Sequence, residues 1–416
     1  MTDSAWVDAA LVTARPQAVG ALLRYFRDLS AAEDAFQEAC VRALKAWPES
    51  GLPRDPAAWL TFVGRNAGLD EARRRNKQSA LPADAQLSDL DNAEDALATR
   101  LDESEARDDV LRLLFVCCHP ELPATQQVAL ALRVVSGLSV PEIARAFLVS
   151  ELAMGQRITR AKQRIAESDV PFETPSAEDR ERRLSVVAAM IYLLFNEGYA
   201  ASSGAEHIRL SLAQEALRLS RLLLQLFADQ AEIMGLTALL VLHHARAPAR
   251  LDASGQIVLL AAQDRSLWDR ALIDEGLGLV EQAARLGRPG PYQVQAAIAA
   301  EHVRAARAED TDWQAIDRWY AVLETLTPSP VITLNRAVAV AKLQGPLAAL
   351  AMIAPLEPRL AGYFHFFGLK GGLLIELGRR DEARAALDRA LALANTAAET
   401  AHLARLLAQL ERDPAA

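Results

Sequence analysis

The chain has 416 residues, of which 51% are hydrophobic and 24% charged, and this composition indicates a globular protein and excludes a disordered one. One hydrophobic core rarely serves a chain of this length, so two or three domains are expected. The net charge of −9 and the isoelectric point near 5.4 exclude a surface coated uniformly with basic residues, so any nucleic-acid site must be local.

The cysteines and the first residues indicate a cytoplasmic protein. Cys40 and the adjacent pair Cys117 and Cys118 form no disulfide framework, which favours a reducing compartment. Asp3 and Asp8 stand where a secretory signal has basic residues. The longest apolar runs, such as 186–195, are shorter than the roughly 18 residues that a membrane span needs, so no membrane partner is expected.

Apolar residues recur at spacings of three and four along nearly the whole chain, and alternating runs are almost absent. This periodicity predicts an all-α fold. Clusters of helix-breaking residues predict breaks at 48–56, 81–109, 170–175, 246–255, 287–291 and 327–330.

The segment 31–47 predicts the first helix with a functional face. Its acidic and amide residues share one side of the helix, and its apolar residues lie largely on another: Asp34, Gln37 and Glu38 against Phe36, Ala39, Val41 and Leu44. Such an acidic face can dock a basic partner, although most such faces only meet water. The pattern leaves both possibilities open.

The next helix, predicted over 57–77, combines an aromatic ring, an amide and a cationic run: Trp59, Arg65, Asn66, Arg73, Arg74, Arg75 and Lys77. Rings on which bases can stack and cations that follow the backbone suit single-stranded or melted DNA. Trp59 taken alone is more typical of a core residue. An acidic stretch, 84–109, follows and predicts a solvated linker with helix in its second half.

A helix-turn-helix is predicted over 139–165. A short amphipathic helix over 139–147 leads through Leu148 and Val149 to Ser150, an N-cap for a second helix over 151–165. Four basic residues load this second helix: Arg157, Arg160, Lys162 and Arg164. Helical spacing predicts that the outer face of this helix carries Gln156, Arg160 and Gln163. It predicts that the core face carries Leu152, Ile158 and Ala161. Such a helix can enter a major groove, and an ordinary hairpin with a solvated basic face is the alternative.

Three strings, in this order, resemble regions 2 and 4 of the extracytoplasmic-function sigma factors of the sigma-70 superfamily: AEDAFQEACVRAL, WLTFVGRNAGLDEARRR and GLSVPEIARAFLVSELAMGQRITRAKQRI. The resemblance covers roughly 15–77 and 109–166. It implies that the chain recruits core RNA polymerase to promoter DNA, and that the acidic linker passes through the interior of the polymerase.

The resemblance also implies roles for single residues. Core polymerase would bind Asp34, Gln37 and Glu38. The minus-10 element would be opened and read by Trp59, Arg65, Asn66, Arg73, Arg74 and Arg75, with a flipped base held by the loop 47–57. The minus-35 element would be read by Gln156, Thr159 and Arg160, with Arg157 in a supporting position. Gly155, where the family has a lysine or arginine, and the segment 53–56, in place of a glycine- and phenylalanine-containing loop, depart from the pattern.

The remainder of the chain resembles the branch of these factors with a helical, tetratricopeptide-like C-terminal extension. The strings that carry this likeness include RLLFVCCHPEL, YLLFNEGYAAS and SPVITLNRAVAV. Independently, three residue pairs are separated by 34 positions, the period of a tetratricopeptide repeat: Leu343 and Leu377, Ala349 and Ala383, Ile353 and Leu387. An irregular helical bundle is the alternative.

Two other groups of residues suggest chemistry. Cys117, Cys118 and His119 suggest zinc, but adjacent cysteines lack the spacing of a zinc knuckle, and buried thiols are the preferred interpretation. Acid–base chemistry would need a set of distant side chains to converge: Glu197, His207, His243, His244, Asp264, Glu301 and His302. We expect no metal, no cofactor and no enzymatic activity, and Asp264 or Ser266 is predicted to cap a helix over 268–284.

The sequence thus predicts a sigma region 2 domain (1–80), an acidic linker (81–108), a sigma region 4 helix-turn-helix domain (109–168) and a helical domain (176–416) with tetratricopeptide-like repeats at about 330–411. The predicted function is promoter recognition with core RNA polymerase, regulated in cis by the C-terminal domain, which has an unidentified protein or peptide partner. The alternatives are a helix-turn-helix regulator that does not act through polymerase and an interaction scaffold.

Overall fold

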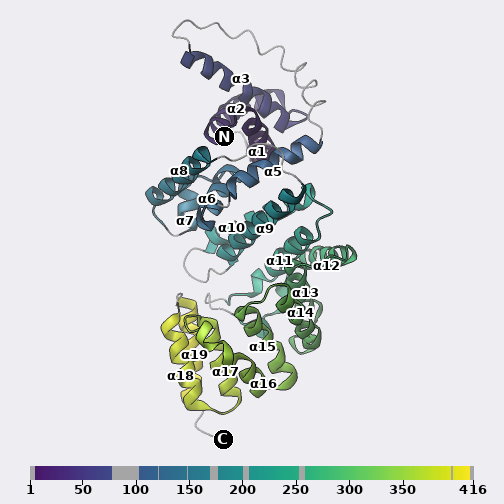
Figure 1. The fold of residues 1–416 in the computed structure, drawn as a ribbon, viewed down its shortest axis with the longest axis vertical. Helices are drawn as coiled ribbons and strands as arrows, with labels where there is room; N and C mark the ends of the chain where they lie inside the picture. Colours follow the sequence, from purple (N-terminus) through teal and green to yellow (C-terminus); the bar gives the residue numbers. More distant parts are fainter. Residues whose placement is uncertain are drawn as a thin grey trace. The chain divides into compact units, whose positions relative to one another are not determined.

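The computed structural model describes residues 5–76, 103–119, 121–147, 149–168, 177–199, 206–252, 258–394 and 397–412. Every regular element in these ranges is an α-helix or a short 3-10 turn, which confirms the predicted all-α fold (Figure 1). The chain forms two compact units, Met1–Leu194 and Phe195–Ala416. Of the predicted acidic linker, residues 81–102 lie outside the described residues.

The first unit begins with three helices, α1 (Ala5–Phe26), α2 (Leu29–Ser50) and α3 (Pro56–Asn76). The Asp28 carboxylate caps α2 by accepting the Ala31 N–H at 2.6 Å. The helix ends at Gly51, whose φ of +85° few other residues adopt and whose N–H donates to the Trp47 carbonyl. The predicted helix 31–47 is therefore longer at both ends, and Pro48 does not break it.

The same unit continues with α5 (Glu103–Cys117), α6 (Ala124–Val134), α7 (Val140–Ala146) and α8 (Glu151–Glu167), and α9 (Ala177–Tyr199) passes from the first unit into the second. Ser139 and Glu142 form a reciprocal capping box at the start of α7. The Ser139 hydroxyl and N–H donate to the Glu142 carboxylate and hold the pKa of that carboxyl below its usual value. Ser150 caps α8 by accepting the Ala153 N–H at 3.2 Å, so the predicted cap and the predicted start of the second helix are confirmed, and this helix ends two residues later than predicted.

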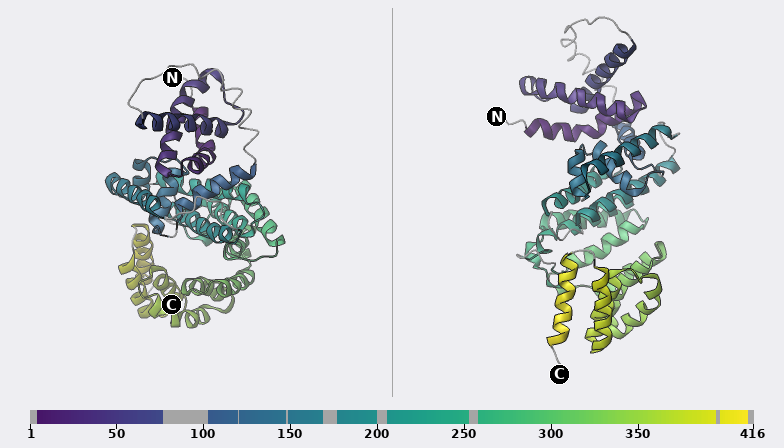
Figure 2. Two further views of the ribbon diagram at one scale, coloured as in Figure 1. Left: turned by 45° about the horizontal axis from the view of Figure 1, so that its top comes forward. Right: turned by 90° about the vertical axis from the view of Figure 1, so that its left-hand side faces the viewer.

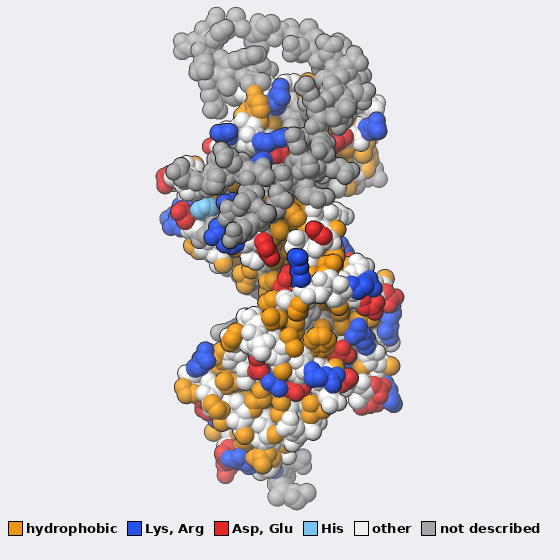
Figure 3. All heavy atoms as spheres, turned by 45° about the vertical axis from the view of Figure 1, so that its right-hand side comes forward, with side chains coloured by type: hydrophobic (Ala, Val, Ile, Leu, Met, Phe, Trp, Pro, Cys, Tyr) orange, Lys and Arg blue, Asp and Glu red, His pale blue; other side chains and the backbone are white. Residues whose placement is uncertain are grey.

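The second unit is a succession of helices that follow one another along a curve (Figure 2). Their bounds are α10 Glu206–Leu226, α11 Ala231–His244, α12 Arg270–Arg285, α13 Pro291–Arg304, α14 Trp313–Leu326, α15 Pro330–Gln344, α16 Pro346–Ile353, α17 Phe364–Glu376, α18 Arg380–Leu393 and α19 Ala397–Arg412. Most residues of α11 are buried, and its sequence is accordingly apolar over most of its length. On the face drawn in Figure 3, apolar side chains of this unit lie among charged ones.

Two of the three residue pairs spaced by 34 positions occupy matching places in the second unit. Ala349 and Ile353 on α16 are fully buried, and so are Ala383 and Leu387 on α18. Leu343 is 44% exposed, so the first pair does not share this environment. The helical domain is thus observed, and its tetratricopeptide-like character stays a prediction.

One predicted cap is wrong. Asp264 accepts the Ser266 N–H and caps only a short 3-10 turn, whereas α12 begins after Asp269, which accepts the Leu272 N–H at 3.1 Å. The chain straightens at Trp268, so the long helix starts two residues later than predicted.

Candidate nucleic-acid and polymerase interface

The helix α8 is oriented by a buried side that consists of Met154, Ile158, Ala161 and Ile165. The predictions for Ile158 and Ala161 are confirmed. The prediction for Leu152 is wrong, because its side chain is 74% exposed and Met154 lies in the core instead. Positions 154, 158 and 161 follow the spacing of one helical face, and position 152 lies about 200° away from position 154.

The opposite side of α8 carries the residues predicted to read DNA. Gln156, Thr159 and Arg160 are exposed, and Arg157 is half-buried. Together with Gln126 of α6 and Ala153, three of these residues line an open hollow: Gln156, Arg157 and Arg160. Sequence reasoning missed Gln126, since nothing in its own helix marks it as a neighbour of α8.

The face predicted to meet melted DNA lies on α3 and its neighbours. Trp59 is half-buried and packs edge-on against the buried Trp47, with ring centroids 5.4 Å apart, so it is partly a core residue. Arg65 is exposed, and its guanidinium carbon lies 5.2 Å from the centre of the Tyr25 ring. Asn66 is half-buried. The Tyr25 ring, 46% exposed on α1, is an aromatic group at this face that the sequence pattern did not indicate.

The cationic run follows on the same helix. The backbone of α3 continues to Asn76 and so includes Arg73, Arg74 and Arg75, but their side chains lie outside the part that the structure describes. Their placement as DNA contacts stays a prediction.

The acidic face of α2 is wider than predicted. Asp34, Gln37 and Glu38 are exposed, and Arg42 donates to Glu38 at 3.2 Å. The prediction that Val41 and Leu44 lie on another side is wrong: they are 48% and 46% exposed, respectively. Seven residues turn a helix by almost two full turns, so Val41 lies on the same side of α2 as Asp34, about 10 Å farther along the axis. The face is therefore acidic at one end and apolar at the other.

The cysteine pair of α5 is buried. Burial raises the pKa of Cys117 well above its usual value and that of Cys118 to about 12, so both thiols are protonated at neutral pH. His119 is partly buried, and this lowers its pKa. Within the described residues, no three His, Cys, Asp or Glu side chains are grouped as metal ligands.

In the second unit, two histidines that are far apart in the sequence, His243 and His302, both lie near Arg246. Burial and the nearby Arg246 lower the pKa of His243 well below its usual value and that of His302 to about 4. Arg246 also lies 2.9 Å from Nδ1 of His243. The structure does not bring Asp264 to them, because it caps its turn at the surface, and the side chains of Glu197 and His207 lie outside the described residues.

Known families match successive parts of the chain, in the same order as the helices described above. The description Sigma-70 region 2 matches residues 11–78, Sigma-70 region 4 matches 112–165, and a family of unknown function, DUF6596, matches 183–284. An uncharacterized protein of Rhizobium meliloti (strain 1021) is 63% identical over 415 residues, which cover 100% of this chain and 98% of that protein. No solved structure matches. A search of the described helices finds none with the length and apolar character of a membrane span.

Proposed function

Since the chain belongs to the sigma-70 factors, as an extracytoplasmic-function-like member with a helical C-terminal extension, we propose that it binds core RNA polymerase through α2 and reads a bipartite promoter through α3 and α8. Sigma-70 regions 2 and 4 indicate a non-enzymatic role in transcription initiation. The polymerase would perform the phosphodiester chemistry. The chain would select the start site and help to melt the DNA.

The observation that carries the proposal is the outward side of α8. Its N-cap and four buried residues fix which side faces out, and that side presents Gln156, Thr159 and Arg160 to solvent. Arginine and glutamine are the side chains that pair bidentately with guanine and adenine in the major groove. Gln126 would extend this reading surface from α6.

Recognition of the minus-10 element would rest on α3. Arg65 and Tyr25 offer a cation beside an exposed ring, an arrangement on which an unstacked base can lie. The short loop between α2 and α3, where Leu52 is 50% exposed, is the proposed place for a flipped base. Regulation by the C-terminal helices, with a protein or peptide partner, completes the proposal.

Run-off transcription tests the proposed role in transcription initiation directly. Purified core polymerase would be given a library of upstream fragments, with and without the whole chain. We expect defined start sites only when the chain is present. Initiation that is the same in both reactions contradicts the proposed function.

Substitutions on the acidic face of α2 test the proposed polymerase interface more specifically. Reversing Asp34 and Glu38 together to lysine should weaken association with core polymerase by at least roughly tenfold, because like charges at a docking surface repel. Glu49→Lys, an exposed reversal farther along the same helix, is the matched control and should bind as wild type does. Affinity is measured by fluorescence anisotropy of labelled chain. Equal affinities for the double reversal and for wild type would remove α2 from the polymerase interface.

A further inference from the structure

The first turn of α8 exposes an apolar side chain. Leu152 is 74% exposed, the highest value among the large apolar side chains that the structure describes. It is the second residue of the helix, which begins at Glu151 directly after the cap Ser150. The structure therefore presents a branched apolar group to solvent at the N-terminal end of the helix that would read DNA.

Leu152 lies in line with the residues proposed to read DNA. Each residue turns an α-helix by about 100°, so positions 156, 159 and 163 lie within about 40° of position 152 around the axis of α8. These three positions are exposed as well. The buried positions 154, 158, 161 and 165 lie about 120° to 180° away from position 152. Leu152 is thus near the middle of the outward side, whereas the hollow beside Arg157 and Arg160 lies on its flank.

The chemistry of a leucine side chain limits what it can recognise on DNA. It has no hydrogen-bonding group, so it can read a base only through an apolar contact. The C5-methyl group of thymine is the apolar group that base pairs present in the major groove, among the donors and acceptors. A helix-turn-helix directs the N-terminal residues of its second helix at base edges. An exposed leucine in the first turn therefore fits a thymine methyl group.

We propose that Leu152 is a specificity-determining residue that contacts the C5-methyl group of a thymine in the upstream element. The inference rests on the proposed function and names one base of that element. Leu152 and Gln156 are four residues apart, which is about 6 Å along the helix axis. Successive bases of a strand are about 3.4 Å apart, so a helix that lies along the groove places this thymine about two base pairs from the base that Gln156 contacts.

This contact differs in its physical basis from those of the neighbouring arginines. It removes a methyl group and part of the leucine side chain from water, and burial of one such group strengthens binding by about threefold. It neutralises no phosphate and releases no counterion. Loss of the Leu152 side chain should therefore weaken binding by the same factor at low and at high salt.

The test removes the methyl group from the DNA and the side chain from the protein. The probe is a duplex with the upstream element recovered by run-off transcription, in which each thymine is replaced in turn by uracil, its analogue without the methyl group. The whole chain is bound to core polymerase, and fluorescence anisotropy measures the affinity for each duplex. With wild type, one of these replacements should weaken binding by about threefold.

Three variants assign this effect to the side chain. Leu152→Ala should bind the thymine and uracil duplexes equally, and Leu152→Met, which keeps an apolar side chain, should still prefer thymine. Leu347→Ala is the matched control, because Leu347 is 64% exposed and is also the second residue of its helix, α16. It should respond to uracil as wild type does. Since both leucines are exposed, circular dichroism should show wild-type helix content in all variants.

A second pyrimidine carries the same methyl group. 5-Methylcytosine has it at the same ring position, and a duplex with this base in place of the thymine separates the two sources. The library fragments contain no modified bases, so the element recovered from them can offer only thymine. Tighter binding of the 5-methylcytosine duplex than of the thymine duplex would assign Leu152 to modified DNA and overturn the assignment to thymine.

The remaining outcomes separate this inference from the proposed function. Equal binding of wild type to the thymine duplex and to every uracil duplex overturns the inference, and so does a preference for thymine that persists in Leu152→Ala. Weaker association of Leu152→Ala with core polymerase, with unchanged DNA binding, would make Leu152 a protein contact instead. In all these cases wild type still binds its element, and the proposed function stands. A wild-type complex without any preferred duplex contradicts the proposed function itself, and the inference is then rejected with it.

Discussion

Arg160 and Arg164 are both exposed and lie one turn apart on α8, yet they are expected to contribute differently to DNA binding. Arg160 borders the hollow shared with Gln126 and Gln156, and it lies one turn nearer than Arg164 to the N-terminal end of the helix, which a helix-turn-helix directs at base edges. Arg164 lies in the last turn, beyond the residues that line this hollow. At the scale of single residues, position along the helix therefore separates base reading from phosphate contact.

Arg160→Ala should weaken binding to the cognate upstream element by about 1–3 kcal/mol, the usual contribution of a bidentate arginine–guanine contact, and should scarcely affect scrambled DNA. Arg164→Ala is the matched control and should weaken both equally. Fluorescence anisotropy titrations at several salt concentrations measure the two effects. An equal loss on both DNAs for Arg160→Ala would make this residue a phosphate contact.

Helix α8 contains a position of low helix propensity next to its reading surface. Gly155 lies inside the helix, where glycine is less favourable than other residues. A Cβ there would meet only Val140, at 3.8 Å, which is ordinary van der Waals contact. The helix therefore has space for a Cβ at this position, where the family resemblance implies a lysine or arginine.

Gly155→Arg should raise the free energy of unfolding by roughly 0.5–1 kcal/mol, because arginine favours the helix, and should strengthen binding to any DNA sequence. Gly155→Ala is the control, with the same gain in stability and no gain in affinity. Urea denaturation and anisotropy measure the two quantities. A loss of stability in both variants would mean that the space beside Val140 is not available.

The position of α9 determines where the chain can be truncated without disturbing the first unit. It belongs mostly to the first unit, and its Arg183 lies 5.4 Å from the ring centre of the buried Phe115 on α5. A chain that ends near Ser168 would lose this cover as well as the second unit. A stop after Tyr199 retains α9 and removes only the helices that follow.

We expect the chain that ends at Tyr199 to fold and to bind promoter DNA, but to support less transcription than the whole chain, as regulation in cis requires. The chain that ends at Ser168 should also be less stable, because Phe115 and its neighbours lose α9. Run-off transcription and thermal denaturation compare the three proteins. Identical transcription by the whole chain and the longer truncation would leave the second unit as an independent interaction module.

The helix-turn-helix could be predicted because its signals are local. Ser139 and Glu142 are three residues apart, Ser150 stands directly before α8, and Ile158 and Ala161 follow helical spacing. The same approach failed for Leu152 and for Val41, since periodicity gives the faces of a helix but does not show which face meets another helix.

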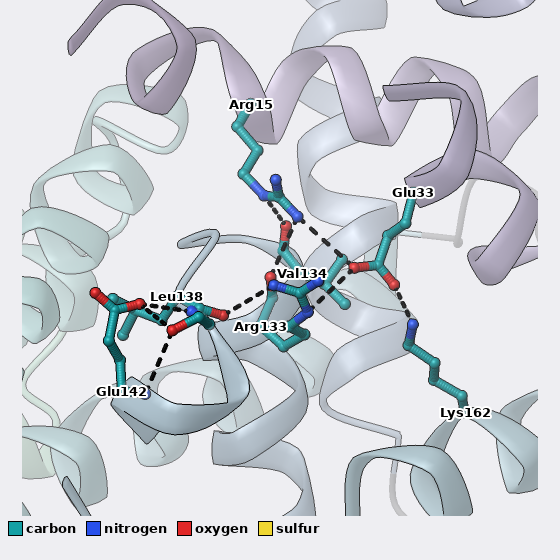
Figure 4. Close-up of polar contacts among 8 residues, drawn as sticks. Arg15, Glu33, Arg133, Val134, Leu138, Glu142 and Lys162 are labelled. Atoms are coloured by element: carbon teal, nitrogen blue, oxygen red, sulfur yellow. Dashed lines mark hydrogen bonds and ion pairs between the residues drawn. The ribbon is translucent and has the colours of Figure 1, made fainter. Parts of the chain in front are cut away.

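The ion pair between Glu33 of α2 and Lys162 of α8, 2.5 Å apart (Figure 4), could not be predicted from the sequence. Glu33 stands beside Asp34 in one acidic string, and only the tertiary packing of α2, which includes α8, makes the first buried and the second exposed. Its partners Arg133 and Lys162 lie far along the chain, in another region. Contacts of this kind, like that of Tyr25 with Arg65, depend on tertiary structure and have no short-range pattern.

The rate at which the Cys117 thiol is alkylated can report motions of the first unit. It is fully buried, and the charges of Glu33, Lys162 and Arg15 influence its pKa. A protonated, enclosed thiol reacts with an alkylating reagent only during an opening event. When opening and closing are fast, the alkylation rate is the open fraction multiplied by the rate of a free thiol. Mass spectrometry of alkylated Cys117 would therefore report how often the surroundings of this thiol open, without any attached label and in the presence of whatever partner is added.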